Sequence, residues 1–374
     1  MPLSLDRTSA ASGSNSLESL HRGTRDHATS DDQRPTLTIG LVNNMQDGAL
    51  EATERQFMSL LGAASEDMLI RLRLYQLPDI VRGETATRHV ATRYIDMNTL
   101  WNEQLDGLIV TGREPSTALL RDEPYWNTFE RLVGWAHGHT VSTIWSCLGA
   151  HAAVLQMDGI PRVRSGHKHY GLFDCEVLSH HPLTSGLPSR FRIPHSRWNG
   201  LDAHQLVKYG YEVLTYSERV GVDAFVKQNQ SLFVFFQGHP EYDANTLLLE
   251  YRRDVARYLR GDATVYPSIP QTYFDEEAAE ALRDIAHEAR LFPREELLSE
   301  VSAVLERVPL THPWHLPAVS TYRNWLRYMA EAKGMPVQGS AGLSFSTNAS
   351  RAKRIVVTTE RGLQLSSTPL RSLQ

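Results

Sequence analysis

Cysteine is the scarcest reactive residue in this chain: Cys147 and Cys175 are the only two among 374 residues. Two cysteines cannot build a disulfide framework, and they cannot supply a zinc or iron–sulfur centre that needs several thiolates. Because the chain does not depend on disulfides, a reducing cytoplasm is the expected compartment.

The chain also has neither a large excess of positive or negative charge nor a long apolar run. The formal net charge is -5, so no global positive field attracts nucleic acid, and we expect no nucleic-acid partner. No apolar run approaches the length of a spanning helix, and residues 1–16 lack the apolar stretch of a signal peptide. We therefore expect no membrane partner either.

Recognised ligand motifs are missing as well. Neither a P-loop nor a G-x-G-x-x-G segment occurs, which removes support for nucleotide binding of those types. Of the 16 histidines, three close pairs lie at 167/169, 180/181 and 312/315, but none forms a known metal-ligand pattern. We interpret these pairs as surface histidines and expect no metal site.

What is present is an alternation of strand and helix patterns after residue 35. The strand patterns are at 36–42, 69–77, 105–112 and 140–145, and the helix patterns at 52–62, 124–138 and 149–157. Such alternation predicts an α/β fold, a doubly wound and mostly parallel sheet flanked by helices. Four further strand patterns fill 171–236, and a helix at 244–261 completes a domain over 36–262.

The remaining segments differ in character. Residues 263–334 contain three amphipathic helix patterns, which predict a C-terminal helical extension. Residues 1–35 and 335–374 are rich in serine and threonine and poor in large apolar groups, so we expect a disordered leader and tail. The tail has five basic residues and one acidic residue, and a solvated tail is favoured over a nucleic-acid arm.

The most specific candidate for a catalytic nucleophile is Cys147, which lies in the segment TIWSCLGAHAAV (143–154). An apolar strand runs directly into this cysteine, and a helix of small residues follows. Such a turn exposes its side chain, and the helix dipole favours a thiolate. The amide of Leu148 would then act as an oxyanion donor. The alternative is a buried cysteine that acts as a small apolar residue.

A second candidate is the segment Gly238-His239-Pro240-Glu241, which follows the strand pattern SLFVFFQ. A histidine at a strand end can act as a base, and Glu241 can orient its imidazole. The alternative is a surface histidine beside a solvated glutamate. An elbow cysteine followed about 90 residues later by strand-end His-Pro-Glu is more specific than either part alone.

These motifs belong to an ordered set. It comprises IGLVNNM (39–45), ATERQF (52–57), DGLIVTG (106–112), YW (125–126), STIWSCLGAHA (142–152), HKHYGLF (167–173), PHSR (194–197), GHPEYD (238–243) and EYRRD (250–254). Over residues 37–260 the chain resembles the homoserine O-acyltransferases of methionine biosynthesis, of the homoserine O-succinyltransferase type. The resemblance implies a class I glutamine-amidotransferase-like fold.

The resemblance also implies roles for individual residues. Cys147 matches the acyl-accepting nucleophile, His239 the general base and Glu241 its orienting partner. Substrate-lining positions of the family fall on three further residues, Lys168, Ser196 and Arg253. An arginine guanidinium can donate two parallel hydrogen bonds to the carboxylate of an amino acid.

The chain departs from the family pattern at two places within this region, and the whole extension after residue 262 is also outside the usual pattern. The family carries a lysine after N-x-M, whereas this chain has Gln46 and Asp47 in a segment two residues longer. Ser116 falls where succinyl-using members have glycine and acetyl-using members have glutamate. A small serine leaves room for a longer acyl group and adds no charge against succinate, which favours succinyl.

The resemblance therefore implies acyl transfer from acyl-CoA, through an acyl-cysteine, to the hydroxyl of L-homoserine. Succinyl is favoured over acetyl, acyl-CoA is a co-substrate, and no resident cofactor is expected. Three alternatives stay open: a glutamine amidotransferase-like cysteine enzyme, an acyltransferase for serine or another hydroxy amino acid, and a pseudoenzyme whose helical extension and tail bind a partner, which the missing lysine suggests. The family tends to dimerise, so a homodimer is one expected assembly.

Overall fold

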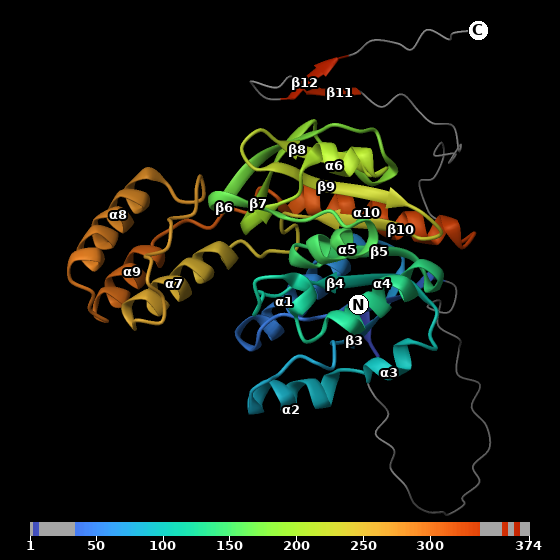
Figure 1. Ribbon diagram of the computed structural model, residues 1–374, viewed down its shortest axis with the longest axis horizontal. Helices are drawn as coiled ribbons and strands as arrows, with labels where there is room; N and C mark the ends of the chain where they lie inside the picture. Colours follow the sequence, from blue (N-terminus) through green and yellow to red (C-terminus); the bar gives the residue numbers. More distant parts are fainter. Residues whose placement is uncertain (1–2, 7–33, 337–353, 358–362, 367–374) are drawn as a thin grey trace, which may run out of the picture.

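A single ten-stranded sheet organises the protein. The computed structural model describes residues 3–6, 34–336, 354–357 and 363–366. Within these residues the strand order is β1-β3-β2-β4-β5-β10-β9-β8-β6-β7 (Figure 1). The parallel part contains β1 (Leu3–Leu5), β3 (Leu69–Tyr75), β2 (Thr36–Val42), β4 (Leu105–Thr111), β5 (Thr140–Ser146) and β10 (Leu232–Phe236). The antiparallel part adds β9 (Gly221–Gln228), β8 (Glu212–Ser217), β6 (Val163–Val177) and β7 (Arg190–Gly200).

Helices cover both faces of this sheet, as the alternating sequence pattern predicts. One hydrophobic core joins the sheet to α3 (Met97–Leu100), α4 (Trp126–His139), α5 (Leu148–Asp158) and α6 (Ala203–Lys208). A second core, on the other face, joins it to α1 (Asp47–Ala64), α2 (Glu84–Arg93) and α10 (His315–Ala332). The predicted α/β class, with a doubly wound sheet flanked by helices, is confirmed.

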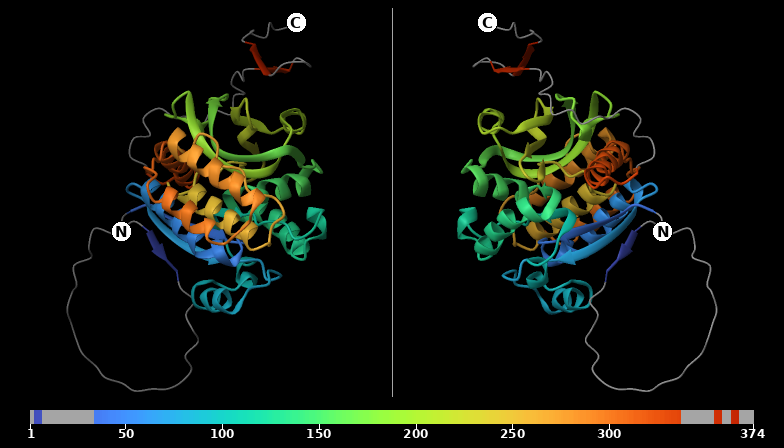
Figure 2. Two further views of the ribbon diagram at one scale, coloured as in Figure 1. Left: turned by 90° about the vertical axis from the view of Figure 1, so that its left-hand side faces the viewer. Right: turned by 90° about the vertical axis from the view of Figure 1, so that its right-hand side faces the viewer.

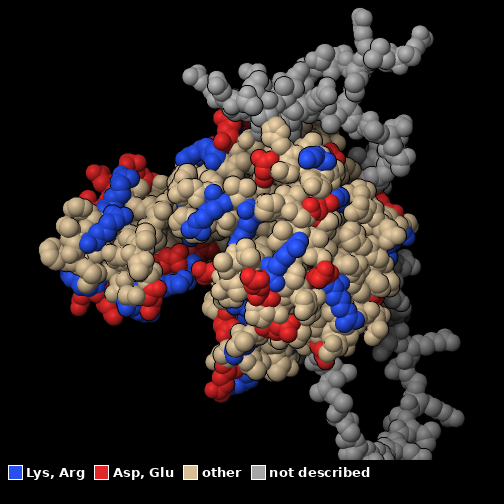
Figure 3. Space-filling view, in the orientation of Figure 1, with Lys and Arg blue, Asp and Glu red and all other residues tan. Residues whose placement is uncertain are grey.

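A third hydrophobic core lies at one end of the molecule. There α7 (Thr246–Leu259), α8 (Glu276–Leu291) and α9 (Leu297–Leu305) pack against residues of β6 and β7. Figure 1 shows these three helices grouped apart from the helices that flank the sheet, and Figure 3 shows the lobe projecting from the body. Charges of both signs are interspersed over the face that Figure 3 displays.

The last helix of the predicted extension has a different place from its neighbours. α10 packs on the sheet, where the indole Nε1 of Trp325 donates a hydrogen bond to the Ser142 hydroxyl at 2.8 Å. Gly107 in β4 permits this approach, because a Cβ there would lie 2.8 Å from Trp325 and from Met329. Of the predicted extension over 263–334, α8 and α9 project, whereas α10 belongs to the core of the sheet domain.

The two ends of the chain are described only in part. Residues 3–5, within the predicted disordered leader, form β1, which pairs in parallel with β3 at the margin of the sheet (Figure 2). Leu3 and Leu5 pack against the second core, and this contact orders a segment of otherwise polar composition. In the predicted tail, β11 (Arg354–Val357) pairs with β12 (Leu363–Ser366). The rest of both segments lies outside the described residues.

Several elements were not expected from the sequence. α2 and β7 lack a clear apolar period, and β7 contains the PHSR segment. Two short 3-10 turns, Leu120–Asp122 and Pro182–Thr184, complete the described elements. Among the helices of the described residues, none is long and apolar enough to cross a membrane.

We predict that Leu326→Ala in α10 lowers the free energy of unfolding by about 2–5 kcal/mol, because Leu326 is fully buried on the sheet. Leu316→Ala, at a 74% exposed position of the same helix, serves as the matched control and should change it by less than about 0.5 kcal/mol. Urea denaturation measures both. Equal effects would show that α10 is not part of the sheet core.

Candidate active site

Cys147 lies at a strained turn between β5 and α5. Its φ is 50° and its ψ is -112°, a conformation that a non-glycine residue rarely adopts. The backbone amide of Cys147 donates to the Phe236 carbonyl at 2.7 Å, which ties the turn to the end of β10. The thiol is partly exposed, as a nucleophile requires, whereas the Cys175 thiol is buried.

The first turn of α5 is held close to the end of β4. A Cβ on Gly112 would lie 2.5 Å from the Leu148 Cβ and 2.7 Å from the Gly149 nitrogen, so only glycine fits there. Leu148 is the first residue of α5, and an amide at that position has no acceptor within its own helix. It can therefore donate to an oxyanion formed on an acyl group at Cys147.

His239 reaches Cys147 because β5 and β10 are parallel neighbours. Their register pairs Ser146 with Phe236, so the residues after both strands emerge at the same edge of the sheet. The imidazole forms a hydrogen bond with the Cys147 sulfur, and its Nδ1 lies 2.9 Å from the Glu241 Oε1. The ring also stacks on Tyr242, with centroids 4.2 Å apart.

The charge state of His239 follows from these contacts. Burial acts to lower its pKa, but the negative charges of the Cys147 thiolate and the Glu241 carboxylate, with hydrogen bonds to both, outweigh burial. The pKa of His239 is raised well above its ordinary value. A protonated imidazole in this position offers a proton and a positive charge next to the Cys147 sulfur, which suits nucleophilic catalysis by a cysteine.

A buried hydrogen-bond network lies behind this pair. His151, one turn along α5 from Cys147, has its Nε2 2.8 Å from the Gln237 Oε1. Gln237 also accepts from the Leu201 amide and donates to the Val222 carbonyl. Burial lowers the pKa of His151 to about 3, so this histidine is neutral and positions the strand end that carries His239.

The three residues expected to line the substrate site converge on one face of α7. Lys168 Nζ lies 3.5 Å from Asp254 Oδ2, and Arg253 Nε donates to Asp254 Oδ1 at 2.9 Å. The Ser196 hydroxyl donates to the Glu250 carboxylate at 2.7 Å. The Tyr242 hydroxyl donates to the same carboxylate at 2.6 Å, which links this face to His239.

Glu250 and Asp254 were not singled out from the sequence. Both stand in the EYRRD segment, but their spacing of four residues also suits an ordinary solvated helix face. Only the structure, in which β6 and β7 approach α7, shows that Asp254 contacts Lys168 and that Glu250 accepts a hydrogen bond from Ser196.

Ser116, the expected acyl-selectivity position, lies in the loop after β4. Its hydroxyl donates to Glu123 Oε2 at 2.8 Å and its amide to Glu123 Oε1 at 2.7 Å. Thr117 donates to the same carboxylate. Burial acts to raise the pKa of Glu123, but these hydrogen bonds outweigh it and lower the pKa.

The segment that lacks the family lysine is held by an arginine from another loop. The buried side chain of Arg82 lies 3.1 Å from the Asp47 carboxylate and donates to the Met45 carbonyl at 2.5 Å. Gln46 lies 3.4 Å from Glu114. Arg82 was not identified from the sequence, because it follows β3 and is far from this segment along the chain.

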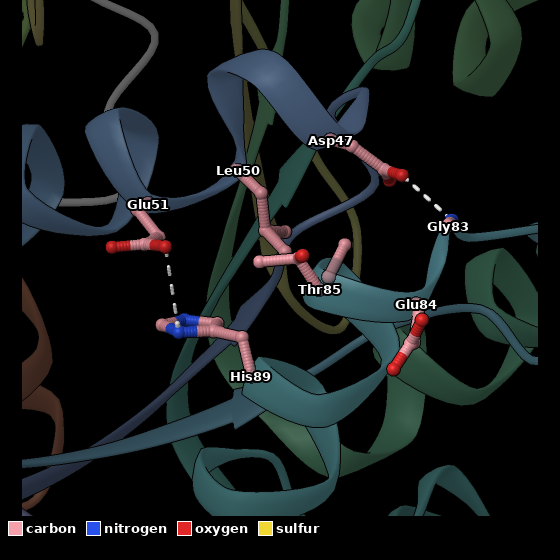
Figure 4. Close-up of a pocket in the computed structure, with 8 residues that line it drawn as sticks. Asp47, Leu50, Glu51, Gly83, Glu84, Thr85 and His89 are labelled. Atoms are coloured by element: carbon pink, nitrogen blue, oxygen red, sulfur yellow. Dashed lines mark hydrogen bonds and ion pairs between the residues drawn. The ribbon is translucent and has the colours of Figure 1, made fainter.

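A pocket of about 310 Å³ opens between the first turns of α1 and α2 (Figure 4). Asp47 and Glu51 come from α1, and Glu84 and His89 come from α2. Asp47 accepts from the Gly83 amide, and His89 faces both Glu51 and the buried Glu54. This acidic lining disfavours anionic ligands, so the pocket is not where an acyl-CoA would bind.

Among the described residues, Cys175, His195 and Asp223 bring ligand-type atoms within 4.8 Å of one another, in the protein interior. His195 accepts a hydrogen bond from Arg197 Nε on its Nδ1, so its Nε2 carries the proton and faces Asp223 at 3.3 Å. A neighbouring guanidinium and a protonated Nε2 do not suit a cation. Burial raises the pKa of Cys175 well above its ordinary value, so this thiol is unreactive.

Comparison with known proteins yields consistent matches. The family model described as homoserine O-succinyltransferase matches residues 2–334. Relatives named homoserine O-succinyltransferase include the protein of Rhodopseudomonas palustris, 46% identical over 294 residues, which cover 79% of this chain and 88% of the relative. The protein of Bradyrhizobium japonicum, of the same name, is 46% identical over 296 residues, covering 79% of this chain and 90% of the relative. A solved glutamine amidotransferase of Thermotoga maritima is 14% identical, with TM-score 0.44, covering 79% of this chain and 98% of its own.

The family match includes α7 to α10. The motif resemblance ended near residue 260, whereas the matched region continues to residue 334. The helices that follow the catalytic-type motifs are therefore part of the pattern that these relatives share.

We predict that Glu241→Gln slows alkylation of Cys147 by iodoacetamide about 10-fold at pH 7. The carboxylate is one of the groups that raise the pKa of His239. Without it the imidazolium is lost at a lower pH, and the Cys147 sulfur loses a neighbouring positive charge.

The exposed Glu218→Gln serves as the control and should react like the unmodified protein. Mass spectrometry of the alkylated peptides separates Cys147 from Cys175, which should stay unmodified in the folded protein. Equal Cys147 rates at pH 7 in the Glu241→Gln variant and the unmodified protein would contradict the ion pair.

Proposed function

The chain belongs to the homoserine O-succinyltransferase family, acyltransferases of methionine biosynthesis, and we propose that it moves a succinyl group from succinyl-CoA through Cys147 to the hydroxyl of L-homoserine. One observation carries the proposal: the cysteine and histidine of the family motifs form a hydrogen-bonded pair at one edge of the sheet. The names of the relatives favour succinyl over acetyl as the transferred group.

The first step makes the acyl-cysteine. The Cys147 sulfur attacks the thioester carbon, and the Leu148 amide donates to the oxygen as it gains negative charge. When the carbon–sulfur bond to CoA breaks, the leaving thiolate takes the proton from the His239 imidazolium. The products are a succinyl thioester on Cys147, free CoA and a neutral imidazole.

The second step depends on the change in charge at Cys147. Acylation removes the thiolate that raised the pKa of His239, so the pKa of the imidazole falls. The neutral imidazole then accepts the proton of the homoserine hydroxyl as its oxygen attacks the thioester. Collapse of the tetrahedral intermediate releases O-succinylhomoserine and restores the thiolate–imidazolium pair.

Homoserine would bind on the α7 face next to His239. The Arg253 guanidinium would donate hydrogen bonds to the carboxylate of homoserine, and the Glu250 carboxylate would accept hydrogen bonds from its ammonium group. Tyr242 connects the two regions, since it stacks on His239 and donates to Glu250. Lys168 and Asp254 complete the charge balance of this face.

We place this reaction in the cytoplasm. The mechanism needs Cys147 as a free thiolate, and both cysteines are free thiols in the structure. A reducing compartment maintains that state.

Cys147→Ala should reduce acyl transfer by more than about 1000-fold, because the nucleophile is removed. Mass spectrometry of the intact protein after incubation with succinyl-CoA should show one added succinyl group in the unmodified protein and in the Cys175→Ala control. The Cys147→Ala variant should show none. Ammonia release from glutamine, without acylation of Cys147, would instead support an amidotransferase.

Arg253→Gln should raise the KM for homoserine by about 10-fold or more, because a charge-assisted hydrogen bond to the substrate carboxylate is lost. The KM for succinyl-CoA should stay unchanged. The neighbouring Arg252 is a matched control, since it is exposed and donates to Ser302 in α9. If Arg252→Gln and Arg253→Gln gave the same steady-state constants, the α7 face would not be the homoserine site.

A further inference from the structure

A buried cluster of polar side chains lies directly behind the loop that carries His239. Its members come from three neighbouring strands of the antiparallel part of the sheet, and all of them are buried: His195 and Arg197 from β7, Thr215 from β8 and Asp223 from β9. Burial of charged and polar groups is unfavourable unless their contacts compensate for the lost water. The contacts of this cluster reach the backbone on either side of His239.

Within the cluster a chain of contacts runs from Arg197 to Asp223 through His195. The Arg197 Nε donates to the His195 Nδ1 at 3.2 Å, and the His195 Nε2 lies 3.3 Å from the Asp223 Oδ1. The Thr215 hydroxyl donates to the Asp223 Oδ2 at 2.8 Å. Burial lowers the pKa of His195 to about 4, so a neutral imidazole separates one guanidinium from one carboxylate.

The Asp223 carboxylate packs against Gly238, the residue before His239. A Cβ on Gly238 would lie 2.4 Å from the Asp223 Oδ1, and 3.1 Å from both the His195 Cε1 and the Ile193 Cγ1. Gly238 does not have a positive φ, so glycine is needed here for space and not for conformation. Among the described residues the Asp223 Oδ1 has no hydrogen-bond partner, which leaves its contacts with Gly238 and His195.

Main-chain hydrogen bonds fix the residues on both sides of Gly238. The Gln237 amide donates to the Asp223 carbonyl at 2.8 Å, and the His239 amide donates to the Pro194 carbonyl at 2.9 Å. Asp223 therefore contacts this loop through both its backbone and its side chain, while β7 contacts it through Pro194. The position of the His239 backbone follows from these contacts.

The strand that supplies His195 and Arg197 also supplies Ser196. Successive side chains of a strand point to opposite faces. The Ser196 hydroxyl accordingly reaches Glu250 in α7, whereas His195 and Arg197 lie on the face toward Asp223. One strand thus connects the proposed homoserine face with the support of the histidine loop.

We propose that Asp223, packed against Gly238 and His195, is a positioning residue that holds the His239 imidazole where it can take the proton of the incoming hydroxyl. The inference rests on the proposed acyl transfer and adds the support of its general base. A hydroxyl needs that base, because an alcohol is a weak nucleophile until its proton is removed. Formation of the acyl-cysteine needs it less, because CoA leaves as a thiolate. A displaced base therefore slows the second step more than the first.

Hydroxylamine separates a displaced base from a damaged site, because it cleaves a thioester without a general base. The protein is first acylated with succinyl-CoA, and the loss of the succinyl group from Cys147 is then followed by mass spectrometry with either acceptor. Asp223→Ala should slow removal by homoserine about 10- to 100-fold, the loss expected when a reacting group is misplaced by about 1 Å. Removal by hydroxylamine should be unchanged. Asp223→Asn keeps the shape that packs against Gly238 and should retain most of the homoserine rate.

Gly238→Ala tests the same contact from the side of the loop. Its methyl group would lie 2.4 Å from the Asp223 Oδ1, so the loop must move although the buried charges keep their partners. We expect the same selective loss with homoserine. The double variant Asp223→Ala/Gly238→Ala should transfer to homoserine faster than Gly238→Ala alone, because removal of the carboxylate makes room for the methyl group.

Ser231→Ala is the matched control. Ser231 is fully buried, but it precedes β10, whereas the loop of His239 follows the other end of that strand. Its hydroxyl contacts the Thr140 hydroxyl at 2.9 Å and is not part of the cluster behind His239. The rates with homoserine and with hydroxylamine should both equal those of the unmodified protein.

Equal losses with homoserine and hydroxylamine would indicate general damage to the site and overturn the proposal. Unchanged homoserine rates in both single variants, or losses that multiply in the double variant, would also overturn it. If Asp223→Ala does not fold, Gly238→Ala decides alone.

Failure of the proposed function is a separate result. It would be seen if the unmodified protein formed no succinyl-cysteine or passed no succinyl group to homoserine. The positioning role is then read from alkylation of Cys147 by iodoacetamide at pH 7. Alkylation should be slower in Gly238→Ala than in Ser231→Ala, because the displaced imidazolium lies farther from the sulfur, and equal rates would overturn the proposal.

Discussion

The pairing of β5 with β10 is the constraint on which the chemistry depends. Because these strands are parallel and in register from Ser142 to Ser146, both chains leave the sheet at the same edge. The elbow after β5 carries the thiol, and the loop after β10 carries the imidazole. The amide of Cys147 donates to the carbonyl of Phe236, so the backbone itself joins the two halves of the site. Parallel neighbours place functional residues together in this way in many α/β proteins.

The helical lobe supports that edge from outside. The indole of Trp314 donates to the Tyr242 carbonyl at 2.8 Å, and Tyr242 stacks on His239. Trp314 is fully buried among residues of α7, α8 and α9. The third hydrophobic core therefore has two effects: it orders α7, which carries Glu250 and Arg253, and it fixes the ring against which the catalytic-type histidine packs.

The distribution of charge separates three environments along one edge of the sheet. The α7 face balances Lys168 and Arg253 against Glu250 and Asp254, which suits a zwitterionic amino acid. The segment after β4 carries Arg113 and Arg121 against Glu114, Asp122 and Glu123, so it has no excess of positive charge. The pocket between α1 and α2 is acidic and disfavours an anionic donor. Net charge alone reveals none of this, since the whole chain carries only -5.

The sequence alone determined the strand–helix alternation, the elbow cysteine and the strand-end histidine, because apolar periods and turn residues are local signals. It also supplied the motifs that resemble the acyltransferases, and with them Lys168, Ser196 and Arg253. Tertiary structure decided the features that depend on contacts between distant segments. These are the packing of α10 on the sheet, the ion pair of Arg82 with Asp47, and the contacts of Lys168 and Ser196 with α7. No local pattern encodes which charges pair, because pairing is settled only when distant segments meet.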